Sequence, residues 1–240
     1  MSRWIARAIA LVTVLVTMLA AVPLQSPAVA ASPDIVISQV YGGGGNSGAT
    51  YKNDFIELFN RSNAAVSVTG WSVQYASATG TAWQVTPLTG TIQPGQYYLV
   101  QEAQGAGGTT PLPTPDATGT IPMGSAAGKV ALVRSTTALS GACPATNVAD
   151  FVAFGSATNP CTEGAPTPAP SNTTAVIRAG SGCTDTDVNR DDFTAAAPAP
   201  RNTSSPLKPC DAPPPPTAPE ATGSASPSTV LPGDPLLLTV

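Results

Sequence analysis

NDFIELFNRSNAAVSVTGW, residues 53–71, is the stretch of sequence that decides the fold. Within it, Phe55–Phe59 is an apolar run interrupted only by Glu57, which is the pattern of a strand covered on both faces. After a polar turn, Gly70 leads into a second strand, where apolar and polar residues alternate over Trp71–Tyr75. That alternation predicts a strand with one buried face. We therefore expect a sheet to begin here, with the tryptophan-led strand as the neighbour of the first.

Similar short apolar runs, separated by Gly, Pro, Asn and Ser, continue through residues 32–210, and none has helical periodicity. The expected strands are Asp34–Tyr41, Asp54–Asn60, Trp71–Ala76, Ala82–Leu88, Tyr97–Gln101, Lys129–Arg134, Val148–Phe154 and Thr174–Arg178. Many short strands with frequent turns predict an all-β sandwich or barrel. The length is ample for one buried core, so a single domain is sufficient.

Two long connections interrupt these strands. Gly42–Tyr51, GGGGNSGATY, predicts a flexible hairpin loop. It shares glycines with phosphate-binding loops but lacks their Lys-Ser/Thr ending and opens no helix. Gly105–Met123 is rich in Gly, Thr and Pro, which predicts a long surface loop.

The N-terminus has the features of a signal peptide over residues 1–30. Arg3 and Arg7 precede an apolar segment, Ala8–Val22, and small residues end at Ala30, so we expect cleavage after Ala30 or Ala31. A retained membrane anchor is the alternative, but the apolar segment is shorter than the roughly 18 residues of a spanning helix. The predicted location is secreted, extracellular and free of the membrane.

The composition changes after residue 210. Residues 211–227 contain PPPPTAPEATGSASP, which predicts an extended linker. Residues 228–240, STVLPGDPLLLTV, have the pattern of a strand at the truncated start of a further β domain, and a lone strand is not stable by itself. We therefore expect the protein to continue.

Charge and histidine content exclude several function classes. The chain has 10 basic and 14 acidic side chains, and loss of the leader arginines brings the net charge near −6. Without a basic stripe, direct nucleic-acid binding is not expected. The absence of histidine excludes the usual serine triad and leaves zinc without its commonest nitrogen ligand.

Export makes disulfides the expected state of the four cysteines. Three pairings are open, and we expect the nearest-neighbour one, which joins Cys143 to Cys161 and Cys183 to Cys210. Zinc is the competing interpretation, and the lack of a CxxC motif disfavours it.

One segment has the spacing of a calcium loop. Asp185, Asp187, Asn189 and Asp191 alternate along DTDVNRDD, so a calcium site is one hypothesis and an Asx-rich turn is the other. The segment departs from the EF-hand pattern, because Arg190 stands where the turn needs Gly and Ala196 stands where a bidentate Glu closes the shell. We expect no other cofactor.

Other candidate chemistry is weaker. Asp54 and Glu57 are close in sequence, but residues three apart point to opposite faces of a strand, so a paired acid–base mechanism is not expected. Aromatic side chains could form a stacking platform, although their strand positions favour core packing. They are Trp71, Tyr75, Trp83, Tyr97 and Tyr98.

An ordered set of motifs resembles the lamin tail domain as it occurs in secreted bacterial proteins. The motif positions in the first strand pair are Asp54, Phe55, Ile56, Glu57, Leu58, Asn60, Gly70 and Trp71. The resemblance continues through Gln93-Pro94-Gly95, Gly128–Leu132 and Asp150–Phe154, and closes at Asp191–Thr203. It implies an immunoglobulin-like β-sandwich over residues 32–210, stapled by disulfides.

The arrangement of signal peptide, sandwich and Pro-rich linker also resembles the front of a secreted nuclease of the endonuclease/exonuclease/phosphatase family. Catalytic domains of that family use histidines and acidic residues around a metal. Because this chain has no histidine, such a domain would lie beyond residue 240. The expected role of the present residues is non-catalytic: binding or positioning within a larger extracellular protein, through a protein or cell-surface ligand. A calcium-stabilised adhesion module is a further hypothesis.

Overall fold

The computed structural model of this chain describes residues 32, 34–155 and 161–210. The predicted signal peptide, linker and further β domain lie outside these residues. The strands are β1 (Ile35–Tyr41), β2 (Asn53–Asn60), β3 (Val66–Ser67), β4 (Ser72–Ala76), β5 (Gln84–Pro87), β6 (Thr91–Ile92), β7 (Tyr97–Gln104), β8 (Ala117–Thr118), β9 (Gly128–Val133), β10 (Val148–Phe154), β11 (Ala175–Arg178) and β12 (Phe193–Ala196). A 3-10 turn, η1 (Gly180–Gly182), and one helical turn, α1 (Asn189–Asp192), lie between β11 and β12.

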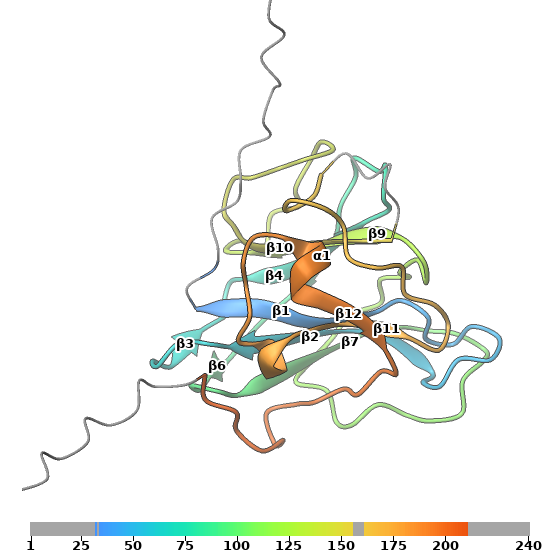
Figure 1. Cartoon of the computed structure of the whole chain (residues 1–240), viewed down its shortest axis with the longest axis horizontal. Coiled ribbons are helices and arrows are strands. Elements are labelled where there is room, and N and C mark those ends of the chain that lie inside the picture. The colour runs from blue at the N-terminus through green and yellow to red at the C-terminus, as the bar shows by residue number, and fades with distance from the viewer. Residues whose placement is uncertain (1–31, 33, 156–160, 211–240) are drawn as a thin grey trace, which may run out of the picture.

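Two sheets face each other in an immunoglobulin-like β-sandwich (Figure 1). The larger sheet has the order β12-β11-β1-β2-β7-β8, and the smaller has the order β10-β9-β4-β5. Neighbouring strands are antiparallel except for β7 and β8. A two-stranded ribbon of β3 and β6 completes the described sheets.

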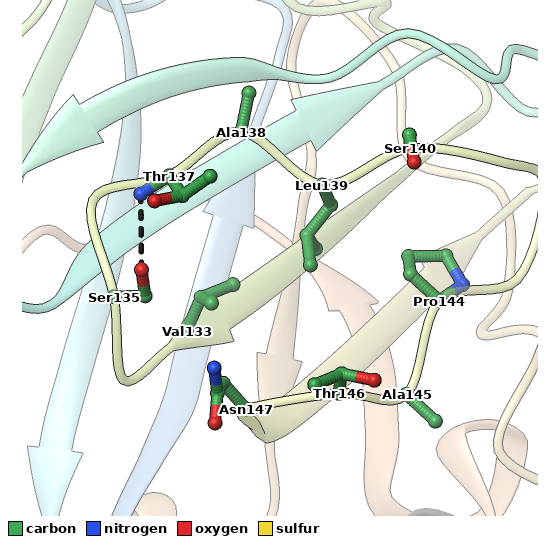
Figure 2. Close-up of a pocket in the computed structure, with 10 residues that line it drawn as sticks. All are labelled: Val133, Ser135, Thr137, Ala138, Leu139, Ser140, Pro144, Ala145, Thr146 and Asn147. Atoms are coloured by element: carbon green, nitrogen blue, oxygen red, sulfur yellow. Dashed lines mark hydrogen bonds between the residues drawn. The ribbon is translucent and has the colours of Figure 1, made fainter.

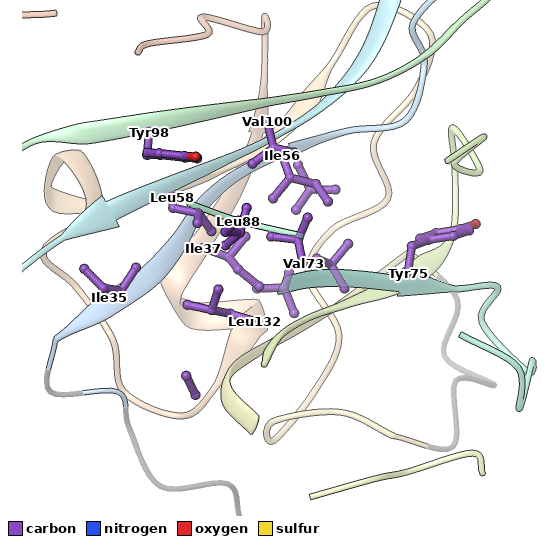
Figure 3. Close-up of a cluster of buried hydrophobic side chains, with 14 of the residues drawn as sticks. Ile35, Ile37, Ile56, Leu58, Val73, Tyr75, Leu88, Tyr98, Val100 and Leu132 are labelled. Atoms are coloured by element: carbon purple, nitrogen blue, oxygen red, sulfur yellow. The ribbon is translucent and has the colours of Figure 1, made fainter. Parts of the chain in front are cut away.

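The main core lies between the two sheets, as Figure 3 shows. Alternate residues of the larger sheet, such as Ile56 and Leu58, meet alternate residues of the smaller sheet, such as Val73 and Leu132. All four side chains are fully buried. The period of two along each strand therefore directs one face of each sheet inward.

β2 and β4, the two strands expected around residues 53–71, do not pair with each other, contrary to our expectation. β2 belongs to the larger sheet and β4 to the smaller, so the chain crosses the sandwich between them. Val66 and Ser67 form β3 during the crossing. Trp71 precedes β4 and is only half-buried, with the Arg134 guanidinium 5.1 Å from its ring centroid.

All eight expected strands are present, with ends that differ by at most three residues. The four strands missed from sequence are β3, β6, β8 and β12. Three of these have two residues each, and β12 has four, Phe-Thr-Ala-Ala, with one large apolar side chain, so none has a recognisable alternation.

The Gly42–Tyr51 hairpin loop is more tightly packed than the expected flexible connector. Its first four glycines are buried, and a Cβ at Gly44 would lie 1.9 Å from the carbonyl carbon of Asn53. The long Gly105–Met123 loop also differs from expectation, because it contains β8 and sends Ile121 and Met123 into the main core.

The outer faces of both sheets are covered as well. Trp83, Ala131 and Phe151 form an apolar cluster on the outer face of the smaller sheet, together with Cys161. Val36, Phe59 and Tyr97 form another on the larger sheet, against Cys183 and Cys210. The disulfides join Cys143 to Cys161 and Cys183 to Cys210, which is the expected nearest-neighbour pairing. Each disulfide therefore joins two segments outside the strands, beside the apolar cluster on the outer face of one sheet.

Among the described residues, no helix is long and apolar enough to cross a membrane.

Candidate functional site

A buried arginine holds the largest cluster of charged side chains. Arg178, at the end of β11, donates from Nε to the Ile37 carbonyl and from Nη2 to Asp150 Oδ2 at 2.9 Å. Its Nη1 donates to Asp185 Oδ1 at 2.9 Å, and Asp192 Oδ2 lies 3.6 Å away. All of these side chains are nearly inaccessible to solvent. The guanidinium is therefore the counter-ion of three buried carboxylates.

Glu163 adds a fourth acidic group to this cluster. Ligand oxygens of Asp150, Glu163 and Asp185 lie within 4.8 Å of one another. Burial, and then the charges of Asp150 and Asp185, raise the pKa of Glu163 to about 10, so its carboxyl is neutral near pH 7. Asn189 donates to Glu163 Oε2 at 3.0 Å. The cluster thus avoids a fourth negative charge by keeping a proton.

The predicted calcium ligands do not all face this cluster. Asp185 pairs with Arg178, while the side-chain amide of Asn189 bonds the backbone of β10 at the Phe151 carbonyl and the Ala153 amide. The side chain of Asp191 is 63% exposed and lies 3.4 Å from Arg190. Asp187 has a left-handed backbone, with φ of 58°. A calcium role for Asp185, Asp187, Asn189 and Asp191 stays a prediction.

Glu57 lies at the centre of the outer face of the larger sheet. A bulge in β1 places Ser38 and Gln39 beside it, and Ser38 Oγ donates to Glu57 Oε1 at 2.6 Å. Its main partner is Arg201, which donates from Nη2 at 2.7 Å, from Nε at 3.1 Å and from the backbone amide at 2.7 Å. Burial still raises the pKa of Glu57. Arg201 belongs to residues 197–210, which we call the strap.

Asp54 lies on the opposite face of β2, as expected, and does not act with Glu57. Its carboxylate accepts hydrogen bonds from the backbone amides of Gly44 and Met123, each at 2.8 Å. Burial raises the pKa of Asp54 to about 7, and the nearby charge of Glu102 adds to this. Glu102 accepts a bond from the Ile121 amide at 2.9 Å, and burial also raises its pKa to about 7. These two acids fasten loops at one end of the sandwich.

An open pocket of about 320 Å³ lies beside the smaller sheet (Figure 2). Its lining contains hydroxyl, amide and apolar side chains and no charged one. The lining residues are Val133, Ser135, Thr137, Ala138, Leu139, Ser140, Pro144, Ala145, Thr146 and Asn147. Nearly all belong to residues 134–147, which connect β9 to β10 and which we call the pocket loop. The site is suited to a neutral polar ligand.

Strand side chains hold the pocket loop in place. Gln74 donates to the Thr137 carbonyl at 2.9 Å and accepts from the Leu139 amide at 2.8 Å. Ser72 donates to the Ser135 carbonyl at 2.6 Å, Trp83 to the Gly141 carbonyl at 3.1 Å, and Lys129 to the Ala142 carbonyl at 2.6 Å. Cys143 then joins the loop to Cys161. The pocket is therefore preorganised, although its loop has no regular secondary structure.

These contacts correct our expectation that β4 has one buried face. Ser72 and Gln74 are fully buried because the pocket loop covers the outer face of the strand. Four of the five aromatic side chains considered for a stacking platform are buried, which confirms core packing for them. They are Tyr75, Trp83, Tyr97 and Tyr98.

Sequence reasoning missed Arg178, Arg201 and Gln74 as organising residues. Their partners are distant in sequence, and no local spacing signals a pairing such as that of Asp150 with Arg178.

Comparison with known proteins shows the family to which this chain belongs. The model of the Lamin Tail Domain matches residues 28–153, from before β1 to the last residue but one of β10. This chain belongs to the lamin tail domain family. No curated protein matches the sequence. Among solved structures, a DUF4876 family protein from Bacteroides thetaiotaomicron is similar, with 13% identity over 73% of this chain and 74% of the other, at a TM-score of 0.49.

The matched range of this lamin tail domain includes the pocket loop, β2 and Gln74 but ends before β11. Arg178, Asp185, Arg201 and the strap therefore follow the matched residues. They nevertheless complete the larger sheet and cover its outer face.

Proposed function

We propose that this lamin tail domain is a secreted, non-catalytic module that binds a neutral, hydroxyl-bearing cell-surface ligand and so positions a larger extracellular protein. The observation that carries the proposal is the preorganised pocket loop. Five hydrogen bonds with side chains of β4, β9 and Trp83, together with one disulfide, fix a loop that lines an uncharged pocket. Rigid loops on a β-sandwich are the usual place of binding function in such folds.

Three buried acidic side chains support the non-catalytic part of the proposal. Asp54, Glu57 and Asp150 are buried, and each carboxylate accepts hydrogen bonds from backbone or guanidinium groups. A general base needs a free lone pair directed at a substrate. Carboxylates held in this way serve the fold instead.

A ligand titration of the full chain tests the binding role. Maltohexaose and chitohexaose serve as neutral, hydroxyl-rich probes, and amide chemical shifts over residues 133–147 are the readout. We expect shifts confined to the pocket loop and lost in Leu139→Asp, which places a charge in the lining. If neither oligosaccharide moves these signals, the pocket is not the binding site we propose.

Activity assays test the non-catalytic role separately. The purified chain is incubated with duplex DNA and with p-nitrophenyl phosphate in the presence of magnesium, and we expect no turnover above a protein-free blank. Turnover that co-purifies with the chain would overturn the proposal.

Secretion and the parent protein belong to the same proposal. Expression with the native leader should yield an exported chain that begins at Ala31 or Ser32, and N-terminal sequencing of that product is the measurement. The Pro-rich segment over 211–227 and the strand pattern over 228–240 favour a longer protein, in which an extracellular nuclease domain is the candidate neighbour. A reading frame that lacks a downstream domain with metal-binding histidines and acids would remove that candidate.

A further inference from the structure

The strap is held on the larger sheet as a bound peptide would be. Gln39 accepts from the Ala199 amide at 2.8 Å and donates to the Ala199 carbonyl at 3.0 Å. Gln96 donates to the Thr203 carbonyl at 2.9 Å, and Asp116 accepts from the Thr203 amide at 3.1 Å. Side chains of the sheet and its loops thus bind the main chain of alternate strap residues, which is how extended peptides are recognised.

Arg201 supplies the side-chain anchor of this segment. Its guanidinium donates to both oxygens of Glu57, at 3.1 and 2.7 Å, and lies 3.7 Å from the centroid of the Tyr97 ring. A bidentate arginine–carboxylate pair is among the more specific polar contacts in proteins. At the far end, Cys210 is joined to Cys183, which packs with Phe59 and Tyr97.

Nothing in these contacts requires that the strap and the sheet belong to the same chain. Only two residues, Ala197 and Pro198, separate the end of β12 from Ala199. Short hinges of this kind invite exchange of the terminal segment between copies. The strap makes the same contacts whether it lies on its own copy or on a second copy. An additional contact must therefore favour the exchanged dimer over the monomer.

The edge of β12 offers that contact. β12 is the last strand of the larger sheet and, among the described residues, pairs only with β11. Thr194, Ala195 and Ala196 are exposed, small and uncharged, and no proline or charged side chain protects this edge. Antiparallel pairing of two such edges would join two copies once their hinges extend.

We infer that two copies of this chain exchange their straps, so that residues 197–210 of one copy lie on the outer face of β1, β2 and β7 of the other. In the exchanged dimer the β12 edges pair, and each Cys210 is joined to Cys183 of the other copy. No new oxidant is needed, because the same number of thiols is oxidised to the same number of disulfides. This dimer is independent of the ligand proposed for the pocket loop.

Isotope mixing tests the exchange directly. Full chains grown in ¹⁴N and ¹⁵N are mixed, unfolded and reduced, refolded with reduced and oxidised glutathione at several protein concentrations, and separated by size without reductant. In the dimer fraction we expect Cys183 peptides of one isotope joined to Cys210 peptides of the other, and a dimer share that rises with protein concentration by mass action. Same-isotope pairs alone, at every concentration, overturn the inference.

A second test avoids refolding. Glu57→Gln and Arg201→Gln copies with different tags are co-expressed, because a mixed dimer restores one Glu57–Arg201 pair while its other site becomes an uncharged Gln–Gln pair. When Glu57→Gln and Arg201→Gln are co-expressed, we expect purification on one tag to recover the copy with the other tag. This recovery should exceed that from cells in which both tags are on the same variant. Recovery of no partner in any combination also overturns the inference.

Hinge and control variants sharpen the result. Inserting Gly-Ser-Gly between Ala197 and Pro198 relaxes the hinge and should lower the dimer share. Arg134→Gln is the control, because Arg134 lies over Trp71, just before β4 of the smaller sheet, and outside the strap and β12. It should leave the dimer share unchanged.

Discussion

Arg178 shows how a single side chain can organise a buried charged cluster. It pairs with Asp150 and Asp185 and lies 3.6 Å from Asp192. Arg61 also pairs with Asp185, and Glu163 stays protonated beside them. Desolvating so many charges is costly, so such a cluster is stable only when each partner is present. Removing the arginine would leave Asp150 buried without its guanidinium partner, while Asp185 would keep Arg61, whose Nη1 lies 3.1 Å from its Oδ2.

Replacing Arg178 with Leu should therefore lower the free energy of unfolding by about 3–5 kcal/mol, the cost of breaking a buried ion pair. Urea denaturation of the full chain is the measurement. Arg190→Leu is the matched control, because the Arg190–Asp191 pair is about two-thirds exposed and such pairs contribute little. Equal losses in the two variants would contradict the role given to Arg178.

Glu102 gives the fold a pH dependence. Its pKa is raised from 4.5 to about 7 in the folded state, because burial disfavours the charged carboxylate. Between these pH values the unfolded chain has released the proton and the folded chain keeps it, so stability falls as pH rises from 4.5 to 7 and is then constant. The slope for one such group is at most about 1.4 kcal/mol per pH unit.

Glu102→Gln should remove that slope while keeping the oxygen that accepts from the Ile121 amide. We expect the variant and the wild type to have similar urea midpoints at pH 4, with the variant more stable at pH 8. A variant that is less stable than the wild type at pH 8 would show that the charged carboxylate favours the fold. Asp54 has the same sign of dependence and contributes in parallel.

At the scale of elements, β4 and the pocket loop depend on each other. Gln74 is fully buried in the strand, and its amide bonds the loop at Thr137 and Leu139. The strand supplies the polar partners that an irregular segment cannot supply for itself. The loop in return covers the outer face of the strand.

Gln74→Leu should release the pocket loop while the apolar side chain still fills the strand position. Hydrogen exchange at the Leu139 amide, which Gln74 accepts in the wild type, should become faster, and stability should fall by about 1–3 kcal/mol for the groups left without partners. Gln84→Leu, at an exposed position of β5, is the control for the same substitution. Unchanged exchange at Leu139 would mean that the other anchors suffice.

The same elements show how far sequence predicts this fold. Alternation located β4 correctly, yet it predicted that the outer face of the strand is exposed, because pairing of Gln74 with a loop more than 60 residues away leaves no local pattern. β12 has one large apolar side chain, Phe193, and forms a strand because β11 pairs with it. Apolar periodicity thus predicts strands that bury large side chains. Apolar periodicity does not predict the strands, buried ion pairs and strap contacts that depend on residues distant in sequence.

At the scale of the whole molecule, two disulfides fasten covering segments to opposite outer faces. Cys143–Cys161 holds the pocket loop against the smaller sheet, and Cys183–Cys210 holds the strap against the larger one. No cysteine belongs to the core that the two sheets share, which Leu58 of the larger sheet represents. The covering segments, which have little regular secondary structure, should depend on the disulfides more than the core does.

Reduction should therefore destabilise the two faces in separate steps before the core is lost. The disulfides close loops of 18 and 27 residues, for which the chain-entropy estimate is about 3 kcal/mol each. Thermal unfolding of Cys143→Ser/Cys161→Ser and Cys183→Ser/Cys210→Ser double variants should give lowered midpoints. Hydrogen exchange should increase first at Leu139 in the former and at Arg201, whose amide bonds Glu57, in the latter. If either variant instead loses protection uniformly across both sheets, that disulfide supports the core itself and not the segment that covers it.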